Sequence, residues 1–403
     1  MKKIISVVIF SFIFIFLLLE STAVHAKEIR GVTEKTIRVG LICDLTGPAS
    51  GVFNGYLQSI RTYFKHVNDH GGLRGRKLKL IVENDRYTIP GSIAAYKKLV
   101  YKDKVLAILG MGGSGQHKAL YDRIEKDRIP VITLSASWHV TRPIKRYSFQ
   151  PINDAGDEMK LIANYLINVK KVKNLRLAFV YADLEAGKMA LDQLEKSMNH
   201  FGRQLVGKEI LGIGDIDAST QVLALKRVKA SHVAFIVAGS GILSLFRDAK
   251  KLAYHPTFVA TFHAIGEDIV RTAGESARKL ISVGGYSSWY ENEPGVAELK
   301  KITLKYHPER KYIEKYATNR YYSKGWLTAL TLVEGAKRAG GELSGETLVS
   351  GLETFQDLDT GGLSPPLSYG PKKRKATEAG KFYKADVEKG YFIPITDWMK
   401  PMH

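Results

Sequence analysis

Cysteine is nearly absent from the sequence, since Cys43 is the only one among 403 residues. A single cysteine cannot form an internal disulfide, so the fold must depend on its apolar core, and a chain of this size can supply one. Cys43 falls inside an apolar stretch and is expected to be a small core residue. It lies far beyond the N-terminal segment, which also excludes a lipid-modified cysteine at a cleavage point.

Acidic residues are scarce relative to basic ones. The chain has 40 acidic residues against 60 lysines and arginines, a net charge of +20. This excess favours anionic ligands or an anionic membrane surface, although a solvated basic surface without a role is equally compatible with it. The densest basic run, Lys372-Lys373-Arg374-Lys375, is interpreted as a charged loop. No nucleic-acid-binding motif accompanies the charge, so no nucleic acid partner is predicted.

The N-terminal segment differs from the rest of the chain. Lys2 and Lys3 precede an almost wholly apolar run, Ile4–Leu19, and Val24-His25-Ala26 places small residues where a signal peptidase cleaves. Residues 1–26 are therefore predicted to be a secretory signal peptide, with the mature protein in the periplasm. The alternative is an uncleaved membrane anchor, but the apolar run is shorter than the roughly 20 residues that span a bilayer.

From residue 36 onward, short apolar runs alternate with segments of helical periodicity. Strands are expected at 37–42, 78–82, 105–109, 131–134, 177–180, 232–237 and 257–260. Alternation of this kind predicts parallel βαβ units with right-handed crossovers. No linker rich in proline, serine or glycine separates the two rounds of units. The predicted fold class is therefore α/β, with two doubly wound, Rossmann-like lobes facing each other across a cleft.

A glycine-rich loop follows the third predicted strand. Gly110, Gly112 and Gly115 fit the pattern G-x-G-x-x-G of dinucleotide-binding loops. A dinucleotide-binding site requires the motif to follow the first strand of its lobe, and it requires an acid at the end of the next strand. Here the next strand ends in Leu134-Ser135-Ala136-Ser137, so both requirements fail. No nucleophile or acid–base constellation stands out either, and the chain is predicted to be neither an NAD-type enzyme nor any other enzyme, with no cofactor.

Two hydroxyl-bearing loops are expected to meet at the carboxyl ends of neighbouring strands. Ser114 stands in the glycine loop, and Ser135 and Ser137 follow the fourth predicted strand. Ligands of open parallel sheets bind at this edge, and glycines leave backbone N–H groups free to face an anion. The loops together predict a carboxylate site. In the alternative interpretation, Ser114 and Ser137 only cap their helices.

Metal binding is not predicted. His66 and His70 are one helical turn apart, as in the H-E-x-x-H zinc motif, but Val67 replaces the glutamate and no third ligand is near.

Several motifs resemble one known family. They are IRVGLICDLTGPASG at 37–51, VNDHGGLRGRKLKLIVEND at 67–85, the glycine loop at 110–115, IPVITLSAS at 129–137, GGLSPPLSYGP at 361–371 and GYFIPITDW at 390–398. These stretches resemble the periplasmic solute-binding proteins of ABC importers, of the branched-chain amino acid (leucine/isoleucine/valine) type with the type I fold. The resemblance covers nearly all of the chain after the signal peptide.

The resemblance implies two lobes joined by hinge strands, with the solute held between them. Lobe 1 is expected from 27–149 plus about 286–360, and lobe 2 from 150–285 plus about 361–403. Ser114 and Ser137 would hold the solute carboxylate, beside the backbone of Ser135, and Ala136 between the two serines is a further candidate ligand contact. The implied protein is a monomeric receptor that delivers a small carboxylate-bearing solute to a membrane ABC permease. A sensor subunit reporting to a membrane kinase or chemoreceptor is the alternative.

The sequence departs from the family at the other end of the solute. Ala186-Gly187 stands where the family usually has Tyr-Gly, and Thr261-Phe262-His263 stands where amino-acid binders commonly place a glutamate for the ligand ammonium. The solute therefore need not carry an α-ammonium group, and His263 is a candidate ligand contact. Three aromatic residues are either pocket walls or packing residues: Phe53, Trp138 and Tyr181.

Overall fold

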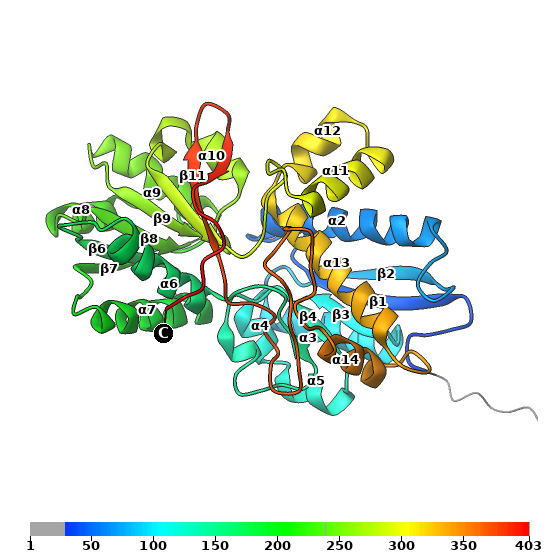
Figure 1. Ribbon diagram of the computed structural model, residues 1–403. Coiled ribbons are helices and arrows are strands. Elements are labelled where there is room, and N and C mark those ends of the chain that lie inside the picture. Colours follow the sequence, from blue (N-terminus) through cyan, green and yellow to red (C-terminus); the bar gives the residue numbers. More distant parts are fainter. Residues whose placement is uncertain (1–28, 238, 403) are drawn as a thin grey trace, which may run out of the picture.

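The computed structural model describes residues 29–237 and 239–402, so the predicted signal peptide lies outside the described residues. The chain forms two α/β lobes, each built around its own sheet, and they stand side by side in Figure 1. Within the described ranges, every helix is too short or too polar to cross a lipid bilayer.

The first lobe contains a five-stranded parallel sheet in the order β2-β1-β3-β4-β5. Its strands are β1 (Thr36–Cys43), β2 (Lys77–Asn84), β3 (Ala107–Gly110), β4 (Val131–Thr133) and β5 (Ser148–Phe149). The first four coincide with predicted strands, whereas β5 has no counterpart among them. Strands β3 and β4 are buried along their whole length, as expected when helices cover both faces of a parallel sheet.

Helices from two distant parts of the chain cover this sheet. From the first part come α2 (Ser50–Asp69), α3 (Ile89–Lys97) with its π-helical extension η1 (Lys98–Lys102), α4 (Ser114–Lys118) and α5 (Tyr121–Asp127). From the second come α11 (Pro294–Tyr306), α12 (Arg310–Tyr312), η5 (Ile313–Ala317), α13 (Arg320–Arg338) and α14 (Gly345–Glu353). Helix α13 packs along α2 and against α14.

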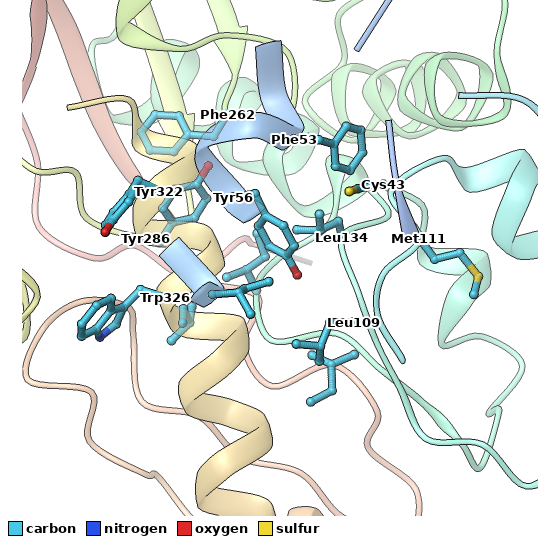
Figure 2. Close-up of a cluster of buried hydrophobic side chains, with 14 of the residues drawn as sticks. Cys43, Phe53, Tyr56, Leu109, Met111, Leu134, Phe262, Tyr286, Tyr322 and Trp326 are labelled. Atoms are coloured by element: carbon cyan, nitrogen blue, oxygen red, sulfur yellow. The ribbon is translucent and has the colours of Figure 1, made fainter. Parts of the chain in front are cut away.

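Gly325 allows α13 to approach α2 closely, because a Cβ there would lie 2.4 Å from the carbonyl oxygen of Tyr56. Figure 2 shows the apolar cluster at this junction, where Tyr56 of α2 lies near Tyr322 and Trp326 of α13. Cys43, predicted as a core residue, is buried in the same core.

The second lobe contains a seven-stranded sheet in the order β12-β11-β10-β9-β8-β6-β7. Its strands are β6 (Leu177–Tyr181), β7 (Gly207–Ile210), β8 (His232–Ile236), β9 (Thr257–Thr261), β10 (Leu280–Gly284), β11 (Lys381–Asp386) and β12 (Tyr391–Pro394). The strands from β6 to β10 are parallel, and the last two add antiparallel pairs. The second lobe's helices are α6 (Ala155–Asn164) with η3 (Tyr165–Val169), α7 (Glu185–His200), α8 (Ser219–Arg227), α9 (Ser240–Lys251) and α10 (Glu267–Ala273) with η4 (Gly274–Ala277).

Three segments connect the lobes: 150–154 after β5, 285–293 after β10 and 354–380 before β11. They are hydrogen-bonded to one another, since Gln150 N donates to Arg374 O at 2.8 Å and Ser287 N donates to Leu363 O at 2.7 Å. This is the type I periplasmic binding fold with hinge strands that the resemblance implied. The residue numbers given above for the lobe boundaries stay a prediction.

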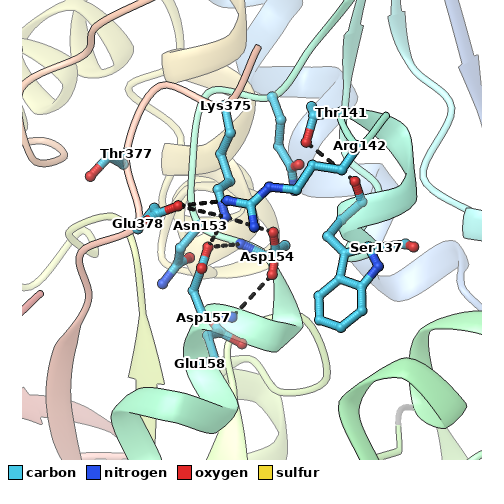
Figure 3. A network of polar contacts seen from close by, with 12 residues as sticks. Ser137, Thr141, Arg142, Asn153, Asp154, Asp157, Glu158, Lys375, Thr377 and Glu378 are labelled. Carbon is cyan, nitrogen blue, oxygen red and sulfur yellow. Dashed lines mark hydrogen bonds and ion pairs between the residues drawn. The ribbon is translucent and has the colours of Figure 1, made fainter. Parts of the chain in front are cut away.

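The basic run at 372–375 is not simply a charged loop. Arg374 and Lys375 are buried, because each meets carboxylates: Arg374 contacts Glu353 at 2.6 Å, and Lys375 Nζ lies 2.7 Å from Asp154 Oδ2. Figure 3 shows Lys375 among Asp154, Asp157 and Glu378 at the N-terminal end of α6. The interpretation of the whole run as surface charge is therefore wrong for these two residues: Arg374 joins a hinge segment to α14 of the first lobe, and Lys375 joins it to α6 of the second.

Candidate functional site

A cleft of about 750 Å³, part of it open to solvent, lies between the carboxyl ends of the two sheets. The first lobe contributes Ala49, Val52, Phe53, Tyr87, Gly112, Ser114, Leu134, Ala136, Tyr321 and Lys324 to its lining, and the second contributes Ala182, Leu184, Ala186, Gly187, Ile213, Ile236, His263 and Ala264. The walls are mainly apolar with a few polar side chains, which is typical of sites for small organic molecules.

The loop after β1 is shaped by a buried carboxylate. Asp44 accepts hydrogen bonds from the backbone N–H groups of Thr46, Gly47 and Ala49. These bonds close the turn of the motif Leu45-Thr46-Gly47-Pro48 and start α2 immediately after it. The turn brings Phe53, in the first turns of α2, to the wall of the cleft.

The glycine loop packs closely against that wall. Gly110 has φ +90°, a left-handed conformation that glycine adopts without strain. A Cβ on Gly112 would lie 2.3 Å from Cζ of Phe53, so only glycine fits there without a shift of the ring. The glycines thus serve a tight turn and close packing at the mouth of the cleft.

Ser114 and Ser135 form a hydroxyl pair at the carboxyl ends of β3 and β4. Their Oγ atoms are 2.9 Å apart, and Ser114 lines the cleft. Gly113, not Ser114, is the N-cap residue of α4, and no side-chain capping bond is present there. Ser135 Oγ also accepts from Ser137 N at 3.2 Å. Ala136 lines the cleft between the two serines of its loop.

Ser137 is placed differently from Ser114. It is buried, and its hydroxyl accepts from His139 N at 3.2 Å, which caps the short helix η2 (Trp138–Val140). The capping role considered for this serine is therefore present. Ser137 is not among the cleft-lining residues of the described chain.

Trp138 and Tyr181 lie outside the lining of the cleft in the described part of the protein. A Cβ on Gly156 would lie 2.8 Å from the Trp138 ring, so the indole packs on the first turn of α6. Tyr181 stacks on Phe179 with ring centres 5.7 Å apart. Of the three aromatic candidates, the structure thus brings Phe53 to the cleft and uses the other two for packing.

His263 lines the cleft from the second lobe and contacts a lysine from the first. Its Nε2 lies 3.3 Å from Asn153 O, and its Nδ1 lies 3.5 Å from Lys324 Nζ. Burial and the positive charge of Lys324 lower the pKa of His263 well below its usual value, so the ring is neutral. Lys324 Nζ also donates to Leu134 O at 3.4 Å.

Two ionisable residues of this region were not predicted from the sequence. Lys324 is 4% exposed and lies on α13, far along the chain from the strand-end loops. Glu158, on α6, is fully buried, and its Oε2 lies 4.0 Å from His263 Nε2. A signal for Lys324 existed, because Tyr321, Lys324 and Thr328 share one helical face in an otherwise apolar segment.

No carboxylate lines the cleft within residues 29–237 and 239–402. Glu267, the first acid after His263, is fully buried and forms an ion pair with Arg320 at 3.0 Å. Glu158 lies behind His263 and has no hydrogen-bond partner among the described groups. Burial raises the pKa of Glu158 well above its usual value. The cleft therefore presents a cation and hydroxyls but no acid.

The histidine pair on α2 shows no metal-binding arrangement. His70 Nδ1 lies 2.7 Å from the backbone oxygen of His66, and the two rings pack with centres 4.2 Å apart. In the portion of the chain that the structure describes, no group of three or more potential metal ligands gathers anywhere.

Two lobes of this fold, joined by paired hinge segments around an apolar cleft, define a receptor that binds a solute between its lobes. Residues 36–390 match the family model described as periplasmic binding protein, and the chain belongs to that family. Its members are non-enzymatic solute receptors that act outside the cytoplasm, so the prediction that the chain is not an enzyme is confirmed.

One curated relative is the Leu/Ile/Val-binding protein homolog 3 of Brucella melitensis. It is 24% identical over 211 residues, which cover 52% of this chain and 56% of that protein. The matched region thus spans little more than half of that relative's length.

Solved structures share the fold over almost the whole chain. A branched-chain amino acid ABC transporter protein from Thermus thermophilus with bound valine has a TM-score of 0.82 at 20% identity, covering 92% of this chain and 97% of that one. A fatty acid ABC transporter substrate-binding protein from Thermomonospora curvata has a TM-score of 0.82 at 21% identity, covering 93% and 95%. A solute-binding protein of R. palustris in complex with 4-hydroxybenzoate has a TM-score of 0.78 at 17% identity, covering 91% and 98%.

Proposed function

We propose that this protein is the solute receptor of an ABC importer and that it carries a small carboxylate-bearing solute to a membrane permease. The observation that carries the proposal is the hydroxyl pair of Ser114 and Ser135 at the carboxyl ends of adjacent strands, with Ser114 lining an otherwise apolar cleft. The structural neighbours carry valine or 4-hydroxybenzoate or are named for fatty acids. All of these molecules have a carboxylate and an apolar body.

Solute binding is proposed to close the cleft. The lining comes from both lobes, so a bound solute would contact both and stabilise the closed arrangement through hinge motion of the connecting segments. The receptor would act as a monomer in the periplasm after removal of residues 1–26, and the permease would bind the closed form. A solute that touches both lobes has higher affinity for this form, which is the condition for a population shift.

Ser114→Ala is expected to weaken solute binding about 10- to 150-fold with little change in folding. A hydrogen bond to a charged group contributes roughly 1.5–3 kcal/mol, and the alanine removes one such donor to the carboxylate. The solute is first found by thermal-shift screening of the purified protein against amino acids, aromatic acids and fatty acids. Calorimetric titration of both proteins then gives the ratio of dissociation constants.

Ser350→Ala is the matched control, because Ser350 is an exposed serine on α14 that bonds only to Glu346 O. It should leave the dissociation constant unchanged. If Ser114→Ala lowered the melting temperature but kept the affinity of the unsubstituted protein, Ser114 would have a structural role only and the carboxylate site would be refuted.

A further inference from the structure

We infer that Lys324 is the cationic partner of the solute carboxylate, and that the solute is an acid with an apolar body and no α-ammonium group. This inference rests on the proposed function and specifies the class of solute for the same cleft. It follows from the hydrogen bonds of Lys324, the charges around it and the composition of the cleft walls.

The hydrogen bonds of Lys324 leave one N–H without a partner. An ammonium group has three donors. One points to Leu134 O at 3.4 Å and a second to His263 Nδ1 at 3.5 Å. No other acceptor contacts Nζ among the residues that the structure describes, although Lys324 is 96% buried and lines the cleft. The third donor is available to a molecule in the cleft.

The tautomer of His263 fixes the direction of this network. Asn153 O can only accept a hydrogen bond, so Nε2 of His263 must carry the proton that it shares with this oxygen. In a neutral ring the other nitrogen, Nδ1, is then an acceptor, and Lys324 Nζ donates a hydrogen bond to it. The second lobe thereby holds the ammonium group of the first lobe in place while leaving its charge uncompensated.

No counter-ion lies next to Lys324. Across 29–237 and 239–402, no carboxylate oxygen is within 4.0 Å of Nζ. The ionisable groups that act on it are His263, which is neutral, and Glu158 on α6, whose own pKa burial raises well above the usual value. On α13 itself, Arg320 is already paired with Glu267. Burial lowers the pKa of Lys324 to about 8, a shift that Glu158 opposes, so Lys324 remains mainly cationic at neutral pH.

A buried charge without a counter-ion is costly, and a carboxylate that enters the cleft would compensate it. The cation stands beside the hydroxyl pair, because Leu134, whose carbonyl it contacts, directly precedes Ser135. A carboxylate at this end would meet both an ammonium group and hydroxyls. The remaining walls, which include Phe53, Leu184, Ile213 and Ile236, fit an apolar body.

The cleft is not suited to bind an α-ammonium group. It would lie within a few ångströms of the carboxylate and hence of the Lys324 cation, which would repel it. The lining offers no acid to hold it in the described part of the chain, and Glu158 is screened from the cleft by His263. Amino acids are therefore expected to bind poorly compared with acids of the same carbon skeleton.

The first experiment compares three molecules of one skeleton on the unsubstituted protein: isocaproate, its amide and leucine. Benzoate and octanoate, each with its amide, extend the comparison to aromatic and linear bodies. At least one carboxylate is expected to raise the melting temperature, with a dissociation constant at least about 30-fold below that of its amide. Leucine is expected to bind at least tenfold more weakly than isocaproate.

The second experiment uses Lys324→Met, with Lys337→Met as its matched control. Lys337 lies on the same helix but is exposed and paired with Glu334. Loss of a buried cationic partner should weaken carboxylate binding at least about 30-fold. The melting temperature of unliganded Lys324→Met should be retained or raised, since methionine fills the site without a buried charge. Lys337→Met should bind like the unsubstituted protein.

The third experiment follows affinity against pH. Carboxylate binding needs the charged form of Lys324, so the dissociation constant should be constant between pH 6 and 7 and rise about tenfold per pH unit above about 8. Calorimetry at pH 9 in two buffers of different ionisation enthalpy should show uptake of about one proton. Lys324→Met should show neither effect.

Different failures would have different meanings. Leucine or valine binding more tightly than every acid, or unchanged carboxylate affinity in Lys324→Met, would overturn the role of Lys324 while leaving a solute receptor in place. If none of the carboxylates or amino acids shifted the melting temperature, the proposed function and the role of Lys324 would both be contradicted.

Discussion

Replacing Arg320 with methionine is expected to lower the free energy of unfolding by about 3–5 kcal/mol. Arg320 and Glu267 are both fully buried, and their ion pair of 3.0 Å joins the start of α13 to the start of α10. The guanidinium carbon also lies 3.4 Å from the centre of the Phe262 ring. Methionine would leave the Glu267 carboxylate without its cation in the interior. Urea unfolding at neutral pH gives the difference in free energy.

Arg310→Met is the control for this change. The Arg310 side chain is 90% exposed and forms only an i,i+4 pair with Glu314, so its loss should change stability by less than about 0.5 kcal/mol. Arg320 lies one helical turn before Lys324, and the pair with Glu267 thus also holds the binding lysine against the second lobe. Equal stabilities of the two variants would contradict this account of the junction.

Lys375→Met is expected to lower the free energy of unfolding by a similar amount, about 3–5 kcal/mol at pH 7.5. Lys375 is the one cation in contact with both Asp154 and Asp157 among the described residues, and all three side chains are at most 5% exposed. Both carboxylates belong to the capping box at the start of α6. Without the lysine, the two buried carboxylates would lose their cation, and one of them would have to take up a proton to remain buried. Unfolding curves in urea would measure the loss.

The loss of stability in Lys375→Met should depend on pH. Burial and the neighbouring Asp154 raise the pKa of Asp157 to about 7, and the charge of Lys375 opposes that rise. The lysine therefore stabilises the protein most where the carboxylates are ionised. Removal of Lys375 raises the pKa of Asp157 further, so the difference in unfolding free energy between Lys375→Met and the unsubstituted protein should be largest above pH 7 and shrink as the pH falls. Lys384→Met, an exposed position on β11, should be neutral at both ends of this range. A difference that stayed constant down to pH 4.5 would contradict the assigned network.

Most inner strands of the two sheets could be predicted from apolar runs, because a strand covered on both faces must be apolar along its length. The inner strand β10 (Leu280–Gly284) was not predicted. Edge strand β7, with the sequence Gly-Lys-Glu-Ile, has alternating half-buried and exposed residues and gives no such run. Strand β11 carries Lys381, Lys384 and Asp386 and pairs only after the chain has returned from the first lobe. Its place depends on contacts between distant segments.

The same limit applies to the site. Ser114 and Ala136 could be found because they lie in the loops that follow strand ends, where a parallel sheet places its ligands, and Phe53 was named from the family resemblance. Lys324 and Glu158 lie on helices outside these loops, and Lys324 is far from them along the chain. The packing of α13 on α2 and of α6 behind His263 brings the two residues together. Their burial, and hence their chemistry, exists only in the folded arrangement.

A crystal structure of the protein with its tightest-binding acid would show directly which residues hold the carboxylate. The predicted result is a carboxylate within hydrogen-bond distance of both Ser114 Oγ and Lys324 Nζ, with the apolar body between the walls that carry Phe53 and Ile236. A solute bound in this cleft in the opposite orientation, with its carboxylate remote from both residues, would contradict the claim. So would a solute bound anywhere else on the protein.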